Sequence, residues 1–124
     1  MSPKAPHVWG PSFWHVMHQA ALGYPNEPTT DQRVQYGGFF AALGEVLPCV
    51  ECSARLHQHA SEVPIAGYLD SRSTLFEWTV LIHNRVNRAA RREEWSLSRA
   101  WTEHAAPPVP CGACAPASRD PAEL

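Results

Sequence analysis

Apolar residues along this chain recur at helical spacing, and the alternation typical of strands is nearly absent. Apolar side chains such as Tyr36, Phe40 and Leu43 follow the three- and four-residue steps of an amphipathic helix. The pattern predicts five helices, over residues 12–22, 31–47, 50–61, 75–91 and 95–104. Short connections between them favour an all-α bundle in which neighbouring helices run antiparallel.

Capping and helix-breaking residues set the expected boundaries of the first three helices. Pro11 suits the first turn of the first helix, and Thr29 or Thr30 suits the N-cap of the second. Pro48 should end the second helix, because the residue before a proline disfavours helical geometry. Cys49 would then open the third helix.

The last third of the sequence divides into a helical part and a tail. Thr74 and Glu77 have the spacing of a capping box at the start of the fourth helix. Beyond residue 105 the stretch "APPVPCGACAPASRDPAEL" has no periodicity and is rich in proline and alanine. We therefore expect one domain over residues 1–105 and a flexible tail over residues 106–124.

Charge and hydropathy exclude several classes of partner. The 124 residues carry a formal net charge of -2, which gives no electrostatic case for nucleic acid or an anionic membrane. No apolar run approaches the roughly 20 residues of a membrane span. The first residues, "MSPKAPHVWGPSFW", lack the apolar centre of a secretory signal. We expect neither nucleic acid nor membrane as a partner.

The four cysteines form two CxxC pairs, Cys49/Cys52 and Cys111/Cys114. Such pairs bind zinc, exchange electrons, or stay as inert thiols. Zinc would need all four cysteines, although the second pair lies in the tail, and His57 and His59 suit a chelate poorly.

A redox role draws on the position of the first pair at a helix start. Unpaired backbone N–H groups and the helix dipole stabilise a thiolate there. The usual redox scaffold for CxxC contains strands, which this chain lacks. From the cysteines alone, all three interpretations stay open.

Two further segments carry aromatic, imidazole and carboxamide groups on single helix faces. Trp14 and His18 are four residues apart, and so are His83 and Asn87, with Asn84 next to His83. Paired Trp and His faces can sandwich a flat ring, while carboxamides bond its polar edge. A planar heterocyclic cofactor would fit between such helices.

Together these motifs resemble the Erv/ALR sulfhydryl oxidases. The resemblance rests on "WHVMHQAALGYPNEP", "LPCVEC" and "WTVLIHNRVNR", which follow the family's W-x3-H, YP, PCxxC and W-x4-HNxVN pattern in order over about residues 9–95. The "WGPSFW" opening looks most like members carried by large DNA viruses. The resemblance implies a four-helix bundle with a short fifth helix and FAD at the mouth of the bundle.

The resemblance also implies roles for individual residues. Cys49 and Cys52 would form the active-site disulfide, with Cys52 next to the flavin and Cys49 exposed to the incoming thiol. The residues matching FAD-contacting positions are Trp14, His18, Tyr24, Cys52, His83, Asn84, Val86 and Asn87, with Arg92 and Trp95 where the family often has a basic residue and an aromatic one. No metal is implied, and His57 and His59 become surface residues of the third helix.

The expected reaction is oxidation of dithiols in protein substrates, with electrons passing through FAD to O2 and giving H2O2. Cys111 and Cys114 would be a shuttle on the tail. Family members are usually homodimers through their first two helices, where Gly37 and Gly38 would allow close approach. The alternative function is a helical interaction module held by a zinc site that uses all four cysteines. The compartment stays unknown: host cytoplasm for a viral protein, or the mitochondrial intermembrane space.

Overall fold

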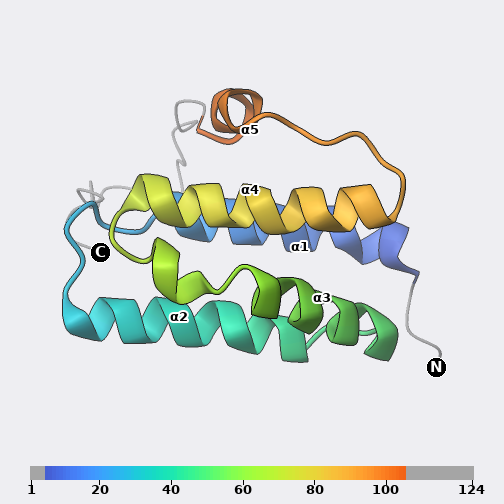
Figure 1. Ribbon diagram of the computed structural model, residues 1–124, viewed down its shortest axis with the longest axis horizontal. Helices are drawn as coiled ribbons and strands as arrows, with labels where there is room; N and C mark the ends of the chain where they lie inside the picture. The colour runs from blue at the N-terminus through green and yellow to red at the C-terminus, as the bar shows by residue number, and fades with distance from the viewer. Residues whose placement is uncertain (1–4, 106–124) are drawn as a thin grey trace, which may run out of the picture.

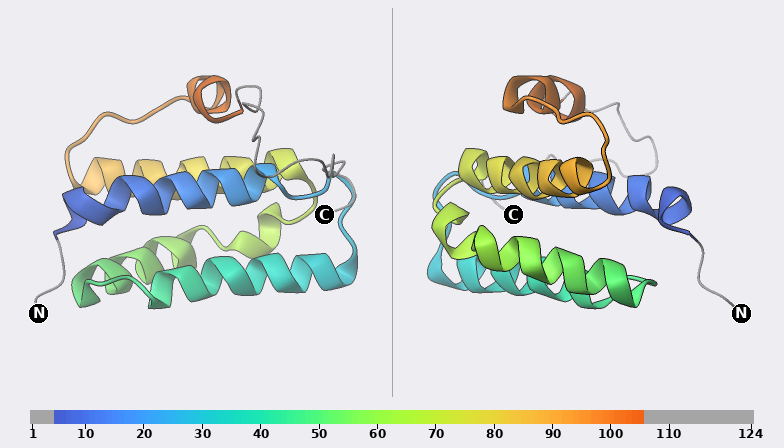
Figure 2. Two further views of the ribbon diagram at one scale, coloured as in Figure 1. Left: turned by 180° about the vertical axis from the view of Figure 1, so that it is seen from behind. Right: turned by 45° about the vertical axis from the view of Figure 1, so that its right-hand side comes forward.

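The computed structural model describes residues 5–105 as a small helical bundle with a fifth helix across it (Figure 1). The elements in order are α1 (Pro6–Leu22), α2 (Thr30–Glu45), α3 (Val50–Glu62), the 3₁₀ helix η1 (Ile65–Tyr68), α4 (Arg72–Ala89) and α5 (Leu97–His104). Helices α1 and α4 lie side by side above α2 and α3, and α5 runs crosswise over α4 (Figures 1 and 2). The all-α prediction is confirmed, and residues 5–105 contain no strand.

Helix α4 is the centre of the fold, because it contacts α1, α3, η1 and α5. Its residues Leu75, Phe76 and Ile82 have no exposed surface. Burying each such side chain contributes about 1.5–3 kcal/mol. Met17 of α1 and Phe40 of α2 complete the core around it. This packing fixes the rotation of α4 about its axis, and with it the direction of every side chain on that helix.

The predicted caps of α2 and α3 are confirmed. Thr29 caps α2 in a capping box with Gln32, whose side chain accepts from the Thr29 N–H. Cys49 caps α3, and its sulfur accepts from the Cys52 N–H at 3.2 Å. Helix α4 begins earlier than expected. Its capping box pairs Ser71 with a hydroxyl residue three positions on, so the Thr74–Glu77 box was wrong.

Helix α1 is also longer than the sequence predicted. It begins at Pro6, which takes the first helical position, and Pro11 lies inside the helix instead of starting it. A proline there removes one backbone hydrogen bond, which the exposed position near the helix start tolerates. The extra turn carries Trp9 and Gly10 to the functional cavity described below.

Candidate functional site

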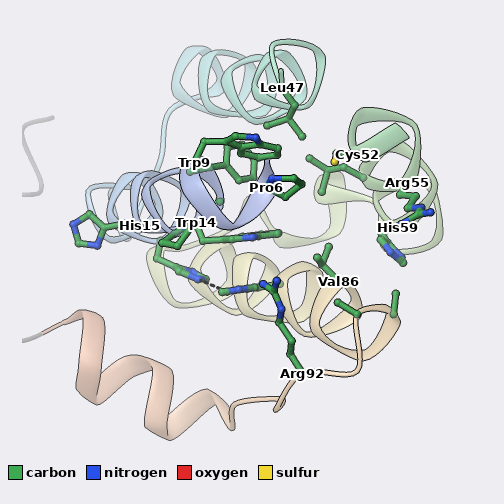
Figure 3. A pocket seen from close by; sticks show the side chains of 18 of the residues that line it. Pro6, Trp9, Trp14, His15, Leu47, Cys52, Arg55, His59, Val86 and Arg92 are labelled. Atoms are coloured by element: carbon green, nitrogen blue, oxygen red, sulfur yellow. Dashed lines mark hydrogen bonds between the residues drawn. The ribbon is translucent and has the colours of Figure 1, made fainter. Parts of the chain in front are cut away.

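A cavity of about 570 Å³ opens at one end of the bundle, within the range of cofactor sites (Figure 3). Three helices supply most of its wall: α1 from Pro6 to His18, α3 from Cys52 to His59, and the second half of α4. The residues that line it and bear on chemistry are Trp9, Phe13, Trp14, His15, His18, Leu47, Cys52, Arg55, His59, His83, Val86, Arg92 and His104.

The Cys49–Cys52 disulfide stands at the edge of this cavity. Cys52 lines the cavity, as its position in Figure 3 shows, whereas Cys49 is not part of the wall. Cys52 is the third residue of α3, so its sulfur lies in the first turn, where free N–H groups and the helix dipole favour a thiolate. The two sulfurs therefore have different surroundings, in agreement with the roles that the resemblance implies.

The aromatic wall differs from the expected sandwich. The rings of Trp14 and His83 stack directly on each other, with centroids 4.1 Å apart and planes 4° from parallel. A flat ligand between them would need a separation of about 7 Å, twice an ordinary contact distance. In this structure the two rings contact each other directly, and a planar ligand held between the two helix faces stays a prediction.

A buried histidine, His18, and a half-buried one, His83, adjoin the cavity and share a hydrogen bond. His18 Nε2 lies 3.0 Å from His83 Nδ1, the dashed line in Figure 3. Burial, and then the nearby His104 and His83, lower the pKa of His18 to about 3. Burial, followed by His104 and Arg92, lowers the pKa of His83 to about 4. Both imidazoles are neutral near pH 7, so this wall offers polar atoms without charge.

Positive charge comes to the cavity from Arg55 on the opposite wall. Arg55 and His59 are one turn apart on α3, on the same face as Cys52. The Nδ1 atom of His59 is buried and has no hydrogen-bond partner. The prediction of His59 as a surface residue was wrong, because its side chain is half-buried in the cavity wall. His57 is exposed as expected and pairs with Glu45 at 2.8 Å.

Arg92 reaches the cavity because of the turn that ends α4. The Arg92 N–H donates to the Asn87 carbonyl at 2.7 Å, and the Arg91 N–H donates to the Arg88 carbonyl at 3.1 Å. These two bonds form a Schellman motif, in which the residue after the C-cap takes a left-handed conformation. Arg91 occupies that position with a φ of 56°. The reversal directs the following residue back toward the cavity.

Four of the predicted cofactor contacts lie outside the cavity wall: Tyr24, Asn84, Asn87 and Trp95. Tyr24 is fully buried, and its hydroxyl donates to the Leu69 carbonyl at 2.8 Å. Asn84 holds the backbone of Trp95 with two hydrogen bonds, of 2.7 and 2.9 Å, and so fixes the segment between α4 and α5. Asn87 is buried. Contact of these four residues with a cofactor stays a prediction, and Cys111 and Cys114 lie outside the described residues.

Several wall residues were not found from the sequence. His104 belongs to α5, and its ring lies 4.4 Å from that of His18. No sequence pattern reports that α5 folds back over α1 and α4. Arg55 and His59 had a signal that was not used, because residues three and seven positions after Cys52 return to the same helix face.

No group of three or more His, Cys, Asp or Glu side chains within residues 5–105 could hold a metal ion. In the same part of the chain, no helix combines the length and apolar character needed to cross a bilayer.

Comparison with known proteins decides the family. The family model described as Erv1 / Alr matches residues 11–106, which is most of the chain. The chain belongs to the Erv1/Alr family. This membership favours the redox interpretation of Cys49 and Cys52 over the zinc module.

Individual relatives agree with this assignment. A protein of Acanthamoeba polyphaga mimivirus, named as a probable FAD-linked sulfhydryl oxidase, is 39% identical over 84 residues, covering 67% of this chain and 59% of its own. The mitochondrial FAD-linked sulfhydryl oxidase ERV1 of Saccharomyces cerevisiae is 29% identical over 89 residues, covering 72% of this chain and 46% of its own. This chain therefore spans about half to three fifths of these two relatives.

Solved structures also match this fold. The crystal structure of the FAD binding domain of Erv1 from Saccharomyces cerevisiae superimposes with a TM-score of 0.72 and 25% sequence identity, covering 77% of this chain and 90% of that chain. The match confirms the predicted fold class.

Proposed function

We propose that this protein is an FAD-dependent thiol oxidase that makes disulfides in protein substrates. The observation that carries the proposal is the Cys49–Cys52 disulfide at a helix start, with only Cys52 facing a cofactor-sized cavity. Each turnover converts a substrate dithiol to a disulfide and releases two electrons and two protons. O2 takes up both and becomes H2O2, so atoms and electrons balance.

The two cysteines divide the work between substrate and cofactor. A substrate thiolate attacks Cys49 Sγ, forming a mixed disulfide, and Cys52 Sγ leaves as a thiolate facing the cavity. The first turn of α3 stabilises that negative charge. The second substrate thiol then attacks the mixed disulfide and frees Cys49. When bound, FAD accepts the electron pair from the dithiol and makes its transfer to O2 fast.

The cavity residues fit such a cofactor. Trp9, Trp14 and Phe13 offer flat apolar faces for its rings. Arg55 and Arg92 bring positive charge for its diphosphate. The buried Nδ1 of His59, which has no partner within the protein, is the sharpest sign that this wall binds a polar ligand atom, since buried polar atoms are nearly always hydrogen-bonded.

Colour, oxygen consumption and one variant test the proposal. The purified full chain should be yellow, with flavin absorption, and should consume O2 when given a dithiol. Cys52→Ser should keep the flavin and lose oxygen consumption. A colourless protein that loses its fold in a chelator would instead support the zinc module, and full activity of Cys52→Ser would overturn the mechanism.

We also propose that Cys111 and Cys114 relay electrons from protein substrates to Cys49–Cys52. The support is their CxxC spacing, which allows a dithiol to cycle with a disulfide. Changing both to Ser should slow the turnover of a reduced protein substrate. Turnover of a small dithiol, which reaches Cys49 directly, should stay unchanged. Equal turnover of the reduced protein by both forms would exclude the relay.

A homodimer through α1 and α2 is the assembly we propose. Helix α2 presents Val34, 71% exposed, on the same outer face as Gly38, where an added Cβ would meet nothing within 4 Å. Small and apolar positions of this kind allow close helix packing between subunits. Sedimentation of the wild type and of Gly38→Glu tests this, since a charged side chain at the interface should yield monomers.

A further inference from the structure

A continuous chain of hydrogen bonds runs from the backbone of α4 to the cavity. The Thr79 hydroxyl donates to the Phe76 carbonyl at 2.6 Å. His18 Nδ1 lies 2.9 Å from the Thr79 oxygen, and His18 Nε2 lies 3.0 Å from His83 Nδ1. Thr79 has no exposed surface and His18 only 2%, so water does not compete for these bonds. The last member, His83, lines the cavity.

Each donor in this chain follows from the one before it. A hydroxyl has a single proton, and that of Thr79 goes to the Phe76 carbonyl. Thr79 must therefore accept from His18, which carries its proton on Nδ1. His18 is neutral near pH 7, because its pKa is lowered to about 3, so its Nε2 has a lone pair and accepts from His83.

The same reasoning sets the state of His83. Its proton lies on Nδ1, since that atom must donate to His18. Burial, and then the nearby His104 and Arg92, lower its pKa to about 4 and keep the ring neutral, and His18 is the titratable group in direct contact with it. Neutral His83 thus carries a lone pair on Nε2. Stacking against Trp14 holds the ring plane, so the direction of this lone pair is fixed.

We propose that Thr79, acting through His18, fixes His83 as a hydrogen-bond acceptor toward the cavity ligand, so that the ligand must present an N–H or O–H group there. This inference rests on the proposed function, in which the ligand is FAD. FAD has such donors in its adenine amino group, the N–H of its flavin ring and its hydroxyls. His18 has both ring nitrogens engaged, and with Thr79 it is a positioning residue.

The motif that identifies the family does not assign this role. Thr79 falls in "WTVLIHN" at one of the unspecified positions of W-x4-HNxVN. Its hydroxyl determines which atom donates and which accepts in each hydrogen bond from Thr79 to His83. A valine of the same shape would keep the packing and remove the acceptor of the His18 proton.

The experiment is ¹⁵N NMR of the histidine rings in the full chain, with flavin bound and after its removal, together with the rate of flavin release on dilution. Wild type should show His18 and His83 both protonated on Nδ1. In Thr79→Val, His18 loses its acceptor and both rings should shift to the Nε2–H form. His83 would then donate where it had accepted, and flavin should leave about tenfold faster or more. Thr79→Ser keeps the hydroxyl and should restore both properties.

The outcomes separate this inference from the function it rests on. A proton on His83 Nε2 in the wild type overturns the proposed hydrogen-bond chain from Thr79 through His18 to His83. That spectrum does not depend on whether Thr79→Val folds. Unchanged flavin release in Thr79→Val, with the tautomers inverted, overturns the selection of a donor-bearing ligand. A colourless protein whose wild-type histidine rings carry protons on Nδ1 supports the proposed hydrogen-bond chain and contradicts the proposed function.

Discussion

Replacing His59 with leucine should have opposite effects on the stability of the flavin-free chain and on its affinity for FAD. The Nδ1 atom of His59 is buried without a partner. A buried polar atom left unpaired costs about 1–3 kcal/mol. His59→Leu removes that cost, so the free energy of unfolding should rise by about 1 kcal/mol, and the melting temperature by about 4 °C or more.

The same substitution should weaken the binding of FAD. In the complex, this nitrogen would hydrogen-bond a polar or anionic group of FAD. A hydrogen bond to a charged group contributes about 1.5–3 kcal/mol, so losing it should weaken binding about tenfold to a hundredfold. Urea denaturation of the flavin-free chain and titration with FAD, followed by flavin fluorescence, measure the two effects separately.

His57→Leu is the matched control. His57 lies on the same helix, but it is exposed and pairs with Glu45 outside the cofactor cavity. The same substitution there should change the unfolding free energy by no more than about 0.5 kcal/mol and leave FAD affinity unaltered. The reasoning is refuted if His59→Leu destabilises the flavin-free chain, or if its FAD affinity equals that of His57→Leu.

Three further predictions follow from the site. Arg91→Gly should raise the unfolding free energy by about 0.5–1 kcal/mol in urea denaturation, because glycine adopts the left-handed conformation at φ 56° without strain; a loss of stability would contradict this. Tyr24→Phe should cost about 1–2 kcal/mol, through the unpaired Leu69 carbonyl, but leave FAD affinity unchanged if Tyr24 is purely structural; weaker binding would make Tyr24 a cofactor contact. The free energy of unfolding of the flavin-free chain should fall from pH 7 to pH 5 by about 1–2 kcal/mol for each of His18 and His83. Their lowered pKa values of about 3 and 4 keep both rings neutral in the folded chain, whereas the same residues in the unfolded chain take up protons near their ordinary pKa of 6.5. A flat profile in urea denaturation would show that the two rings are not held as neutral groups.

Local sequence signals predicted the starts of helices well where a residue has few alternative structural roles. The cap of α2 was predicted as Thr29 or Thr30 and is Thr29, and Cys49 opens α3 as predicted, because a residue directly after a proline has few alternatives. Pro11 was predicted in the first turn of the first helix, but α1 begins at Pro6. Both prolines suit a helix start, so the local signal alone does not separate them.

The cavity was predicted in part, and its missing members have a common cause. Trp14, His18, Cys52 and His83 came from motifs within single helices. His104 entered through the docking of α5, which no local pattern encodes. The direct stacking of Trp14 on His83 likewise depends on the distance between α1 and α4, which is set by packing and not by either helix alone.

Helix α4 explains why so small a bundle can hold a polar site in a fixed geometry. Ile82 is fully buried in the core, while the next residue, His83, faces the cavity about 100° further around the helix. Rotating α4 to release His83 would expose Ile82 and Leu75, each costing about 1.5–3 kcal/mol. The apolar stripe therefore holds the imidazole in place whether or not a ligand is present. Substitutions at His83 should accordingly act on binding more than on folding, whereas substitutions at Ile82 should disturb both.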